Sequence, residues 1–392
     1  MADNSYSFAS LMEITKRPST VFVEGHGSWL KDANGKEYLD FVQGWAVNCL
    51  GHSPKVLVEA IAKQAGKLIN CSPAYYNETM IKLADLIVKY SCLHKVFFTN
   101  SGAEANEGAV KLARKWGQKS RNGAYEIITM DHAFHGRTLA MMSASGKVEW
   151  AQLYEPKVTG FPKVNLDDLN AVQAAINEKT VGVMLEPIQG EAGVFVATDE
   201  YLKGLRKLTR EKGILLILDE IQTGMGRTGK LFGYQHSGVE PDIMTLAKGI
   251  GGGVPLGALV AHESICCFEP GDQGGTFNGN PLMMAVGIAV FGEIMKPGFL
   301  EKVTETGAYL QGRLEELSKQ YGFGEVRGRG LLLAMDLIKE NGPQIVEESL
   351  NRGLLINSPR KNTLRFMPAL IVTREEIDRM IDILKKVFPV VG

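Results

Sequence analysis

The stretch "ILLILDEIQTGMGRTG", Ile214 to Gly229, joins an apolar run to two carboxylates and a loop with three glycines. A strand that is apolar at every position is buried on both faces of a sheet. Asp219 and Glu220 therefore stand at the end of a buried strand. A carboxylate there needs a cationic or hydrogen-bonding partner, because unpaired burial is costly. That partner is either a structural salt bridge or part of a functional site.

Further short apolar runs alternate with segments of helical periodicity from about residue 95 onward. The candidate strands are 95–99, 125–130, 181–188, 214–220, 242–247 and 257–261, and helix-like segments such as 103–117 and 199–213 lie between them. This alternation predicts an α/β fold with a largely parallel sheet that helices cover on both sides. Ligands of such sheets bind beyond the carboxyl ends of the strands.

The two ends of the chain differ from this central part. Residues 27–41, "GSWLKDANGKEYLDF", read as two short strands around Asn34-Gly35, a dipeptide typical of a type I′ hairpin. Near the C-terminus, Thr373 and Glu376 have the spacing of a capping box before an amphipathic helix. The segments 324–338 and 363–372, which precede that helix, read as strands, so this part of the chain indicates a separate, smaller α+β domain.

The length of 392 residues suggests two or three domains. We expect an N-terminal segment, 1–60, that joins the small domain. We expect the large ligand-binding domain at 61–290 and the C-terminal small domain at 291–392.

Composition narrows the classes of function. The formal net charge of -1 gives no electrostatic argument for binding nucleic acid or an anionic membrane surface. The five cysteines are scattered and form no CxxC pair, so reduced thiols are favoured over a disulfide framework or a zinc site. No apolar run approaches the roughly 18 residues of a membrane helix, and the first residues lack the apolar core of a secretory signal. We therefore expect a cytoplasmic protein that binds small molecules.

A small-residue turn follows the first candidate strand of the sheet. Ser101, Gly102 and Ala103 come directly after "FFTN" and open a helix-like segment. The first turn of a helix presents free backbone N–H groups and the positive end of the helix dipole, which together favour a phosphate. Alternatively, Ser101 only caps the helix.

Lys248 has an unusual setting for a lysine. It follows the apolar strand 242–247 and precedes Gly249 and three further glycines. Most lysines are solvated surface charges. Removal of water in such surroundings would lower the pKa of Lys248 and make its amine a usable nucleophile.

A phosphate cradle, an acid and a desolvated lysine thus stand at the carboxyl ends of strands in one predicted sheet. This combination fits pyridoxal 5'-phosphate (PLP). In that interpretation Lys248 forms the Schiff base, Asp219 keeps the pyridine nitrogen protonated, and the turn at Ser101 holds the phosphate.

With these residues in place, the chain resembles the class III, or ω-amino acid, aminotransferases of PLP fold type I. The resemblance covers nearly the whole chain. Its motifs occur in the family's order: "NSGAEANEGAVKLARK", "AFHGRT", "EPIQGEAGV", "LDEIQTGMGRTG", "LAKGIGGGVPLGA" and "GGTFNGNPL". It implies a large, mainly parallel sheet domain, a smaller α+β domain and PLP as the cofactor.

The resemblance also implies roles for individual residues around the cofactor. Lys248 would be the catalytic lysine and proton shuttle, and Asp219 would pair with the pyridine nitrogen. Gln222 would hydrogen-bond the ring hydroxyl, and Phe134 and Ile221 would lie against the two ring faces. The remaining cofactor residues would be Ser101, Gly102 and Ala103 at the phosphate, and Thr276 at the phosphate of the neighbouring subunit. A homodimer with shared active sites follows from this last assignment.

Three charged residues resemble the family's substrate-binding groups. Arg365 in "LRFMPAL" looks like the clamp for the α-carboxylate of glutamate and 2-oxoglutarate, for which bidentate guanidinium geometry is suited. Glu191 in "QGEAG" resembles the acid that pairs with this arginine when an ω-amine occupies the site. Arg137 in "HGRT" matches the arginine for the far carboxylate of the substrate. The alternative for each is an ordinary surface or interdomain ion pair.

Length and the "GWAVNCLGH" segment favour members of the family that act in arginine biosynthesis. These move the δ-amine of N2-acetyl-L-ornithine to 2-oxoglutarate and yield N-acetylglutamate 5-semialdehyde and glutamate. Trp45 in that segment and the variant motif "GGTFNGNP" depart from the commoner family pattern. Ornithine, succinylornithine and 4-aminobutyrate remain alternative donors. An aminomutase of the glutamate-1-semialdehyde type is an alternative reaction, but the "GEAG" and "LRF" pair favours transamination.

Overall fold

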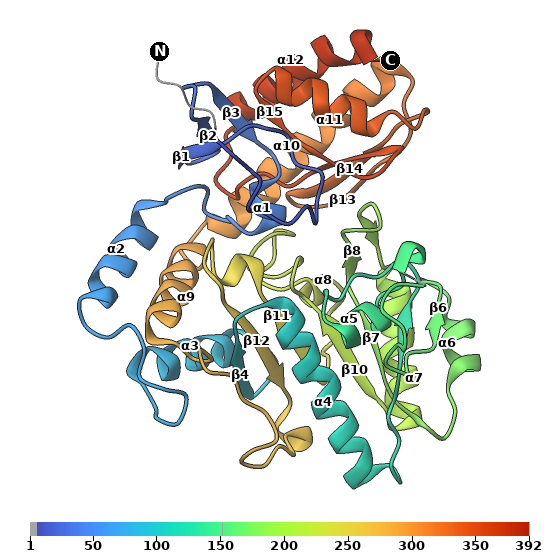
Figure 1. The fold of residues 1–392 in the computed structure, drawn as a ribbon. Helices are drawn as coiled ribbons and strands as arrows, with labels where there is room; N and C mark the ends of the chain where they lie inside the picture. The colour runs from blue at the N-terminus through green and yellow to red at the C-terminus, as the bar shows by residue number, and fades with distance from the viewer. Residues whose placement is uncertain (1–5, 151, 392) are drawn as a thin grey trace.

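The stretch 214–220 forms β10 (Leu215–Asp219), whose five residues are all buried in a seven-stranded sheet (Figure 1). The computed structural model describes residues 6–150 and 152–391. In this part of the chain the sheet has the order β4–β12–β11–β10–β7–β5–β6. Its other strands are β4 (Lys95–Thr99), β5 (Glu126–Met130), β6 (Lys163–Val164), β7 (Thr180–Leu185), β11 (Ile243–Leu246) and β12 (Gly257–Ala261).

The strands of this sheet run in one direction, with the exception of β12. β10 is parallel to β7 and β11, and β5 is parallel to β7 and β6. β12 is antiparallel to both of its neighbours, β11 and β4, so β4 again has the common direction. The prediction of a largely parallel sheet is confirmed. The carboxyl ends of β4, β7, β10 and β11 consequently meet at one edge.

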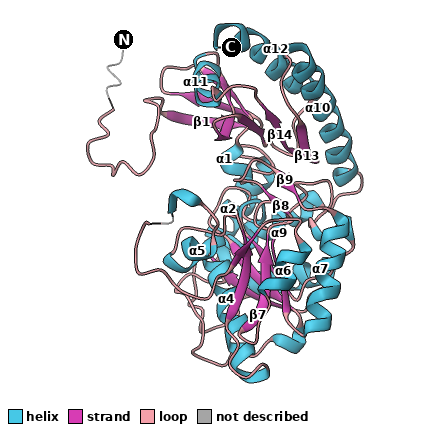
Figure 2. Ribbon diagram, turned by 90° about the vertical axis from the view of Figure 1, so that its right-hand side faces the viewer, coloured by secondary structure: helices cyan, strands magenta, loops and turns pink. Residues whose placement is uncertain are grey.

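Helices cover both faces of the sheet. Figure 2 shows the sheet with α4 (Gly102–Ser120) on one side and α6 (Leu169–Ala175) and α7 (Asp199–Lys212) on the other. The apolar face predicted for α4 lies inward, since Ala105, Ala109 and Leu112 are buried. The short α5 (Leu139–Ala144) packs beside α4.

The N-terminal strands pair with a strand from near the C-terminus. β1 (Phe22–His26), β2 (Trp29–Asp32), β3 (Glu37–Asp40) and β15 (Leu354–Leu355) form a four-stranded sheet. β15 is parallel to β3, with Leu354 opposite Leu39. Figure 1 accordingly shows β1, β2 and β3 beside β15 in the upper part of the molecule.

The hairpin predicted around Asn34-Gly35 is present, but its predicted turn type is wrong. A type I′ turn needs a positive φ at both central residues, and only Gly35 of this dipeptide has one, at 84°. The Asp32 carboxylate accepts hydrogen bonds from the N–H groups of Asn34 and Lys36, both at 2.9 Å. These bonds stabilise a longer connection between β2 and β3.

The C-terminal part forms another four-stranded sheet with helices packed on it. The strands are β13 (Val326–Arg329), β14 (Leu332–Asp336), β17 (Thr363–Phe366) and β16 (Asn357–Arg360), and the helices are α10 (Phe299–Tyr321), α11 (Gly342–Asn351) and α12 (Arg374–Val391). The capping box before α12 is confirmed: Glu376 N–H donates to Thr373 Oγ1 at 3.2 Å, and Thr373 N–H donates to Glu376 Oε2 at 2.9 Å.

The remaining elements connect these layers. They are α1 (Gln43–Ala46), α2 (Lys55–Ala65), α3 (Glu78–Tyr90), α8 (Tyr234–Ser237), α9 (Pro281–Ile294), the strands β8 (Ile188–Gln189) and β9 (Phe195–Val196), and the 3₁₀ turns η1 (Val148–Trp150), η2 (Lys248–Ile250) and η3 (Glu263–Ile265). The predicted boundaries after residues 60 and 290 fall inside α2 and α9, two helices that pack on each other. The division into 1–60, 61–290 and 291–392 stays a prediction.

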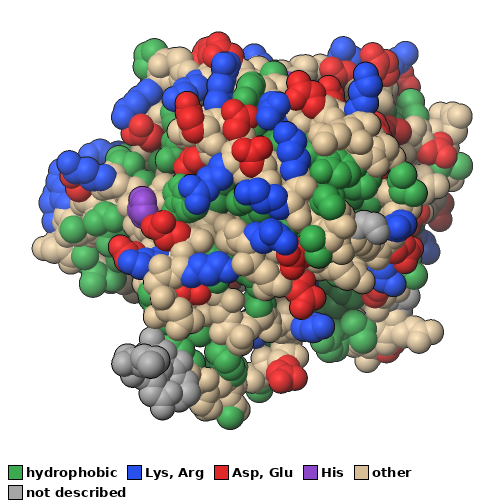
Figure 3. Space-filling view, turned by 90° about the horizontal axis from the view of Figure 1, so that it is seen from above, with side chains coloured by type: hydrophobic (Ala, Val, Ile, Leu, Met, Phe, Trp, Pro, Cys, Tyr) green, Lys and Arg blue, Asp and Glu red, His purple; other side chains and the backbone are tan. Residues whose placement is uncertain are grey.

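The distribution of surface charge and the apolarity of the helices bear on whether the protein binds nucleic acid or crosses a membrane. Figure 3 shows basic and acidic side chains intermingled over the face above the C-terminal elements, in keeping with the net charge of -1. Over residues 6–150 and 152–391, no single helix has the length and apolarity to cross a membrane. In this described part of the chain, α9 and α10 pass that test only as a pair, and they are bent by 73° where they meet.

Candidate active site

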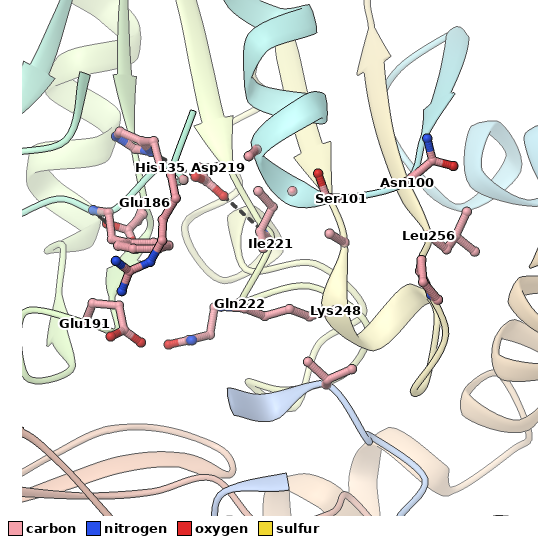
Figure 4. A pocket seen from close by; sticks show the side chains of 18 of the residues that line it. Asn100, Ser101, His135, Glu186, Glu191, Asp219, Ile221, Gln222, Lys248 and Leu256 are labelled. Atoms are coloured by element: carbon pink, nitrogen blue, oxygen red, sulfur yellow. Dashed lines mark hydrogen bonds and ion pairs between the residues drawn. The ribbon is translucent and has the colours of Figure 1, made fainter. Parts of the chain in front are cut away.

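A cavity of about 530 Å³ lies at the edge where the carboxyl ends of the parallel strands meet. This volume is typical of sites for small ligands. The cavity brings together most of the residues singled out in the sequence (Figure 4): Ser101, Gly102, Ala103, Phe134, Arg137, Glu191, Asp219, Ile221, Gln222 and Lys248. Parallel strands explain why residues so far apart in the sequence meet here.

Asp219 is held rigidly at the end of β10. Its Oδ2 accepts a hydrogen bond from Nδ2 of Asn106 at 2.8 Å and lies 2.8 Å from Nδ1 of His135. Its Oδ1 accepts from the N–H of Ile221 at 3.1 Å. Thr245 donates in turn to Oδ1 of Asn106 at 2.7 Å. His135 and Asn106 were missed in the sequence, because each meets Asp219 only through the packing of separate elements.

Glu220 serves the structure. It is fully buried, and its carboxylate accepts hydrogen bonds from the N–H groups of Gly233 at 2.7 Å and Tyr234 at 2.6 Å. The Thr223 hydroxyl donates to it as well. The two carboxylates at the end of β10 therefore have separate surroundings.

Lys248 lies where β11 ends, and its amine faces the cavity. Its φ of 48° places a non-glycine residue in the left-handed region, a conformation that is strained and concentrated at functional sites. Burial lowers the pKa of Lys248, nearby Arg365 lowers it further, and Glu191 opposes the shift. A lowered pKa increases the fraction of the neutral, nucleophilic amine.

The N-terminus of α4 forms one end of the cavity. The Ser101 hydroxyl accepts a hydrogen bond from Glu104 N–H at 3.2 Å, so Ser101 is the N-cap of the helix. The N–H groups of Gly102 and Ala103 belong to the first turn, where no intrahelical acceptor exists. A Cβ at Gly102 would lie 2.7 Å from Cδ1 of Ile221, so glycine allows the helix to approach this side chain closely. The geometry suits an anion at the helix N-terminus.

Glu191 and Arg365 form an ion pair beside the cavity. Nη1 of Arg365 lies 2.7 Å from Oε1 of Glu191, and Nε of Arg365 donates to Asn357 at 2.9 Å. Burial acts to raise the pKa of Glu191, but Arg365 and Lys248 outweigh it, and the pKa is lowered. Arg365 itself is completely buried, and its Nη2 has no hydrogen-bond partner among the residues that the structure describes. The N–H groups of Nη2 are thus left for a ligand.

The polar and apolar groups between these ends fit PLP. Phe134 and Ile221 supply an aromatic and an aliphatic wall to the cavity. Nε2 of Gln222 is buried and has no hydrogen-bond partner within residues 6–150 and 152–391. An unpartnered buried amide is costly unless a ligand completes it. A phosphorylated pyridine with a hydroxyl group matches the helix N-terminus, the carboxylate of Asp219 and this amide.

Two sequence-derived residues lie outside the group around Lys248. Thr276 lines a separate cavity together with Asn100 and Phe277, so its contact with a neighbouring subunit stays a prediction. Trp45 has a φ of 62° and its side chain is 50 % exposed, while Val47 reaches the cavity wall.

Glu186 is a further cavity residue that was missed in the sequence. It follows β7, is 6 % exposed, and accepts a hydrogen bond from the Phe134 N–H at 3.0 Å. In Figure 4 it lies with Glu191 on the side of the cavity opposite Ser101. Burial, and then the charge of Asp219, raise the pKa of Glu186 well above its ordinary value. The sequence contained a signal for Glu186, because this residue, like Asp219, is a carboxylate at the end of a buried strand.

The raised pKa of Glu186 predicts a pH-dependent stability. The folded protein binds the Glu186 proton more tightly than the unfolded chain, so this group lowers stability as pH rises from the unfolded pKa to the folded one. Glu186→Gln imitates the neutral acid and keeps an acceptor for Phe134. We expect the variant to gain unfolding free energy over the unmodified apoprotein at pH 8 and little or none at pH 5. Urea unfolding at both pH values measures the difference.

The matched control is Glu178→Gln, which removes a carboxylate from an exposed position. For this control, the difference in unfolding free energy from the unmodified apoprotein should not grow comparably between pH 5 and pH 8. A difference for Glu186→Gln that is the same at pH 5 and pH 8 would contradict the assignment.

Comparisons with known proteins agree with this geometry. The family model for class-III aminotransferases matches residues 13–388. The chain is 60 % identical to the acetylornithine aminotransferase of Ralstonia nicotianae over 98 % of each chain. Among solved structures, it superimposes on ornithine aminotransferase from Toxoplasma gondii with a TM-score of 0.93 and 31 % identity, covering 98 % of this chain and 93 % of the other. It superimposes on N-acetylornithine aminotransferase from Stenotrophomonas maltophilia with a TM-score of 0.84 and 34 % identity, covering 95 % and 96 %.

Proposed function

The chain belongs to the class-III aminotransferase family, and from this membership we propose its reaction. The proposed reaction transfers the δ-amino group of N2-acetyl-L-ornithine to 2-oxoglutarate, yielding N-acetylglutamate 5-semialdehyde and glutamate in arginine biosynthesis. Enzymes of this family depend on PLP, and their substrates are small amino donors and keto acids. The name of the Ralstonia nicotianae relative supports the choice of donor.

The observation that carries the proposal is the Glu191–Arg365 ion pair next to Lys248. While the pair is closed, Arg365 is neutralised and the cavity accepts a donor whose reacting end carries an ω-amine. When the pair opens, Arg365 is free to bind the α-carboxylate of 2-oxoglutarate in a bidentate manner. An enzyme that must accept these two ligands in turn needs such a removable counter-charge.

The residues around the cofactor site are assigned roles on the same basis. PLP, when bound, supplies an aldehyde that takes up amino groups and a ring that delocalises negative charge. Lys248 is the catalytic amine, which carries a proton at Nζ between the reacting positions. Asp219 keeps a proton on the ring nitrogen. The remaining proposed contacts to the cofactor are those of Ser101, Gly102, Ala103, Phe134, Ile221 and Gln222.

Replacing Arg365 by alanine should affect the two half-reactions unequally. The half-reaction with 2-oxoglutarate loses the α-carboxylate clamp and should slow by about a hundredfold, the effect of truncating a buried charged partner. The half-reaction with acetylornithine, which does not use that clamp, should slow by about tenfold or less, because Glu191 is left without its partner. Single-turnover absorbance measurements with each substrate give both rates.

Arg352→Ala serves as the control, because Arg352 pairs with Glu348 on α11, away from the cavity. It should leave both half-reactions unchanged. Equal losses in both half-reactions of the Arg365→Ala variant would argue against the Glu191–Arg365 switch.

The donor is tested by direct competition between substrates. Acetylornithine, succinylornithine, ornithine and 4-aminobutyrate are each offered with 2-oxoglutarate, and kcat/KM is compared. We expect the highest value for acetylornithine. A higher value for another donor would transfer the assignment to that donor, and turnover of glutamate-1-semialdehyde without 2-oxoglutarate would identify an aminomutase.

We further propose a homodimer in which Thr276 of each subunit completes the active site of the other. Thr276 lies apart from the cavity of its own chain, next to the exposed Phe277. Tyr75 and Tyr76 are also largely exposed, and exposed aromatic groups are enriched at interfaces between subunits. The cytoplasm is the proposed compartment, which the five free cysteines support.

A further inference from the structure

Two cationic side chains flank a buried tryptophan beside the cavity. Cζ of Arg137 lies 5.3 Å from the ring centroid of Trp150, and Nζ of Lys147 lies 5.4 Å from it. Nζ of Lys147 is also 5.2 Å from the ring of Phe134, a wall of the cavity. The two aromatic rings are in contact, with centroids 5.8 Å apart. Trp150 thus forms a platform for both cations.

The backbone fixes Lys147 relative to Phe134. Gly146 N–H donates to Ala133 at 3.0 Å, and its carbonyl accepts from the N–H of His132 at 3.0 Å. A Cβ at Gly146 would come within 2.4 Å of the His132 nitrogen, so this close pairing requires glycine. The backbone of Lys147 therefore has a defined position beside the segment that carries Phe134.

The 3₁₀ turn η1 then brings Trp150 under Lys147. The Trp150 N–H donates to the Lys147 carbonyl at 3.1 Å. Residues three apart in a 3₁₀ turn lie on the same side. Trp150 is 8 % exposed, whereas Lys147 is only half-buried and Arg137 is exposed. The ammonium group is consequently held over the buried ring of Trp150 while its charge remains accessible.

Among the described residues, the positive charges of Arg137 and Lys147 are not held in an ion pair. Across residues 6–150 and 152–391, no hydrogen bond or ion pair of either side chain is found, and both are held by aromatic contacts. Like charges near one ring repel each other, and an anion placed between them removes that cost. Lys147 is also near enough to Glu191 to contribute to lowering the pKa of that acid.

We propose that Lys147, seated on Trp150, determines specificity by binding with Arg137 the substrate carboxylate that lies farthest from the reacting carbon. For 2-oxoglutarate this is the distal carboxylate, and for an ω-amino donor it is the α-carboxylate. This inference rests on the proposed aminotransferase function. It adds a second cation to a subsite for which the sequence indicates Arg137 alone.

The test compares two acceptors in the holoenzyme with the same donor. 2-Oxoglutarate carries a distal carboxylate, and 2-oxobutyrate lacks one. Lys147→Met keeps the length and the apolar stem of the side chain. It should raise KM for 2-oxoglutarate about tenfold, the loss expected for one charged contact, and should not raise KM for 2-oxobutyrate, which has no second carboxylate to reach Lys147. Lys147→Arg should recover most of the loss, because it restores the cation over Trp150.

Lys179→Met is the matched control, because it removes the same charge from an exposed position beside the other end of β7. It should change neither KM. A rise of KM for both acceptors with Lys147→Met, or for neither, would overturn the proposal.

Binding of glutarate, an unreactive dicarboxylate, separates this inference from the proposed function. Calorimetry should show weaker glutarate binding to the Lys147→Met holoenzyme and unchanged binding to the Lys179→Met control. If the unmodified protein transaminates none of the donors but Lys147→Met still weakens glutarate binding, the reaction is wrong and the subsite stands. Equal glutarate affinity in all three proteins would refute the subsite whatever the reaction.

Discussion

Replacing Lys248 by alanine is expected to lower the rate of transamination by about four orders of magnitude, the combined effect of losing a nucleophile and a proton carrier. The amine of Lys248 faces the cavity, and burial lowers its pKa. Alanine removes the amine and leaves the neighbouring residues in place. Steady-state turnover of acetylornithine and 2-oxoglutarate measures the loss.

Two controls separate chemistry from structure in this experiment. Circular dichroism and thermal unfolding should show that Lys248→Ala keeps the fold. Alanine adds no atoms that could clash with neighbouring residues, and it leaves no buried hydrogen-bond acceptor unpaired. Lys179→Ala, at an exposed position, should retain full activity. Added methylamine should restore part of the turnover of Lys248→Ala, since it supplies the missing amine. Turnover by that variant within tenfold of the unmodified enzyme would refute the assignment of Lys248.

Asp219→Asn is expected to lower kcat by roughly two to three orders of magnitude, as removal of a preorganised electrostatic group does. The carboxylate of Asp219 is buried, and bonds with Asn106, His135 and the Ile221 N–H fix its direction. Asparagine has nearly the same shape but carries no negative charge. The ring nitrogen of the cofactor would then lose the group that keeps it protonated.

Reconstitution with PLP methylated at the ring nitrogen tests this explanation. The methylated ring carries a permanent positive charge and needs no acid to maintain it, so it should recover part of the activity of Asp219→Asn. Asn106→Ala is the companion variant, because it removes a partner of Asp219 and leaves the charge. It should cost much less than Asp219→Asn. Equal losses, or no recovery with the methylated cofactor, would show that Asp219 acts only through packing.

The central fold could be predicted from the sequence because its strands are buried on both faces. The runs 95–99 and 257–261 form β4 and β12 with the predicted boundaries. The stretch 363–372 was interpreted as a strand, but only its first four residues form β17. The residues that follow are apolar and, except for the exposed Ile371, buried for another reason, since Met367 packs between the two parts of the molecule on the way to α12. Periodicity reports burial, and it does not distinguish a strand from an extended buried connection.

The candidate site was predictable where strand ends or motifs carry the chemistry, and less so where packing does. The pairing of Glu191 with Arg365 follows from the resemblance, and the structure places their charged atoms 2.7 Å apart. His135 and Asn106 could not be assigned to Asp219, because no local spacing connects a loop, a helix and a strand. Lys147 reads as an ordinary polar residue until the 3₁₀ turn places it over Trp150.

The pairing of β15 with β3 sets an order of events for the growing polypeptide. Leu39 emerges early from the ribosome, but its partner Leu354 is synthesised only near the end of translation. Until then the edge of the N-terminal sheet has no partner, and contacts of such long sequence separation form slowly. Unpaired edges of this kind are prone to aggregation. The large sheet, whose strands all lie between residues 95 and 261, can form meanwhile, so the carboxylate clamp on β17 is the last part of the site to be assembled.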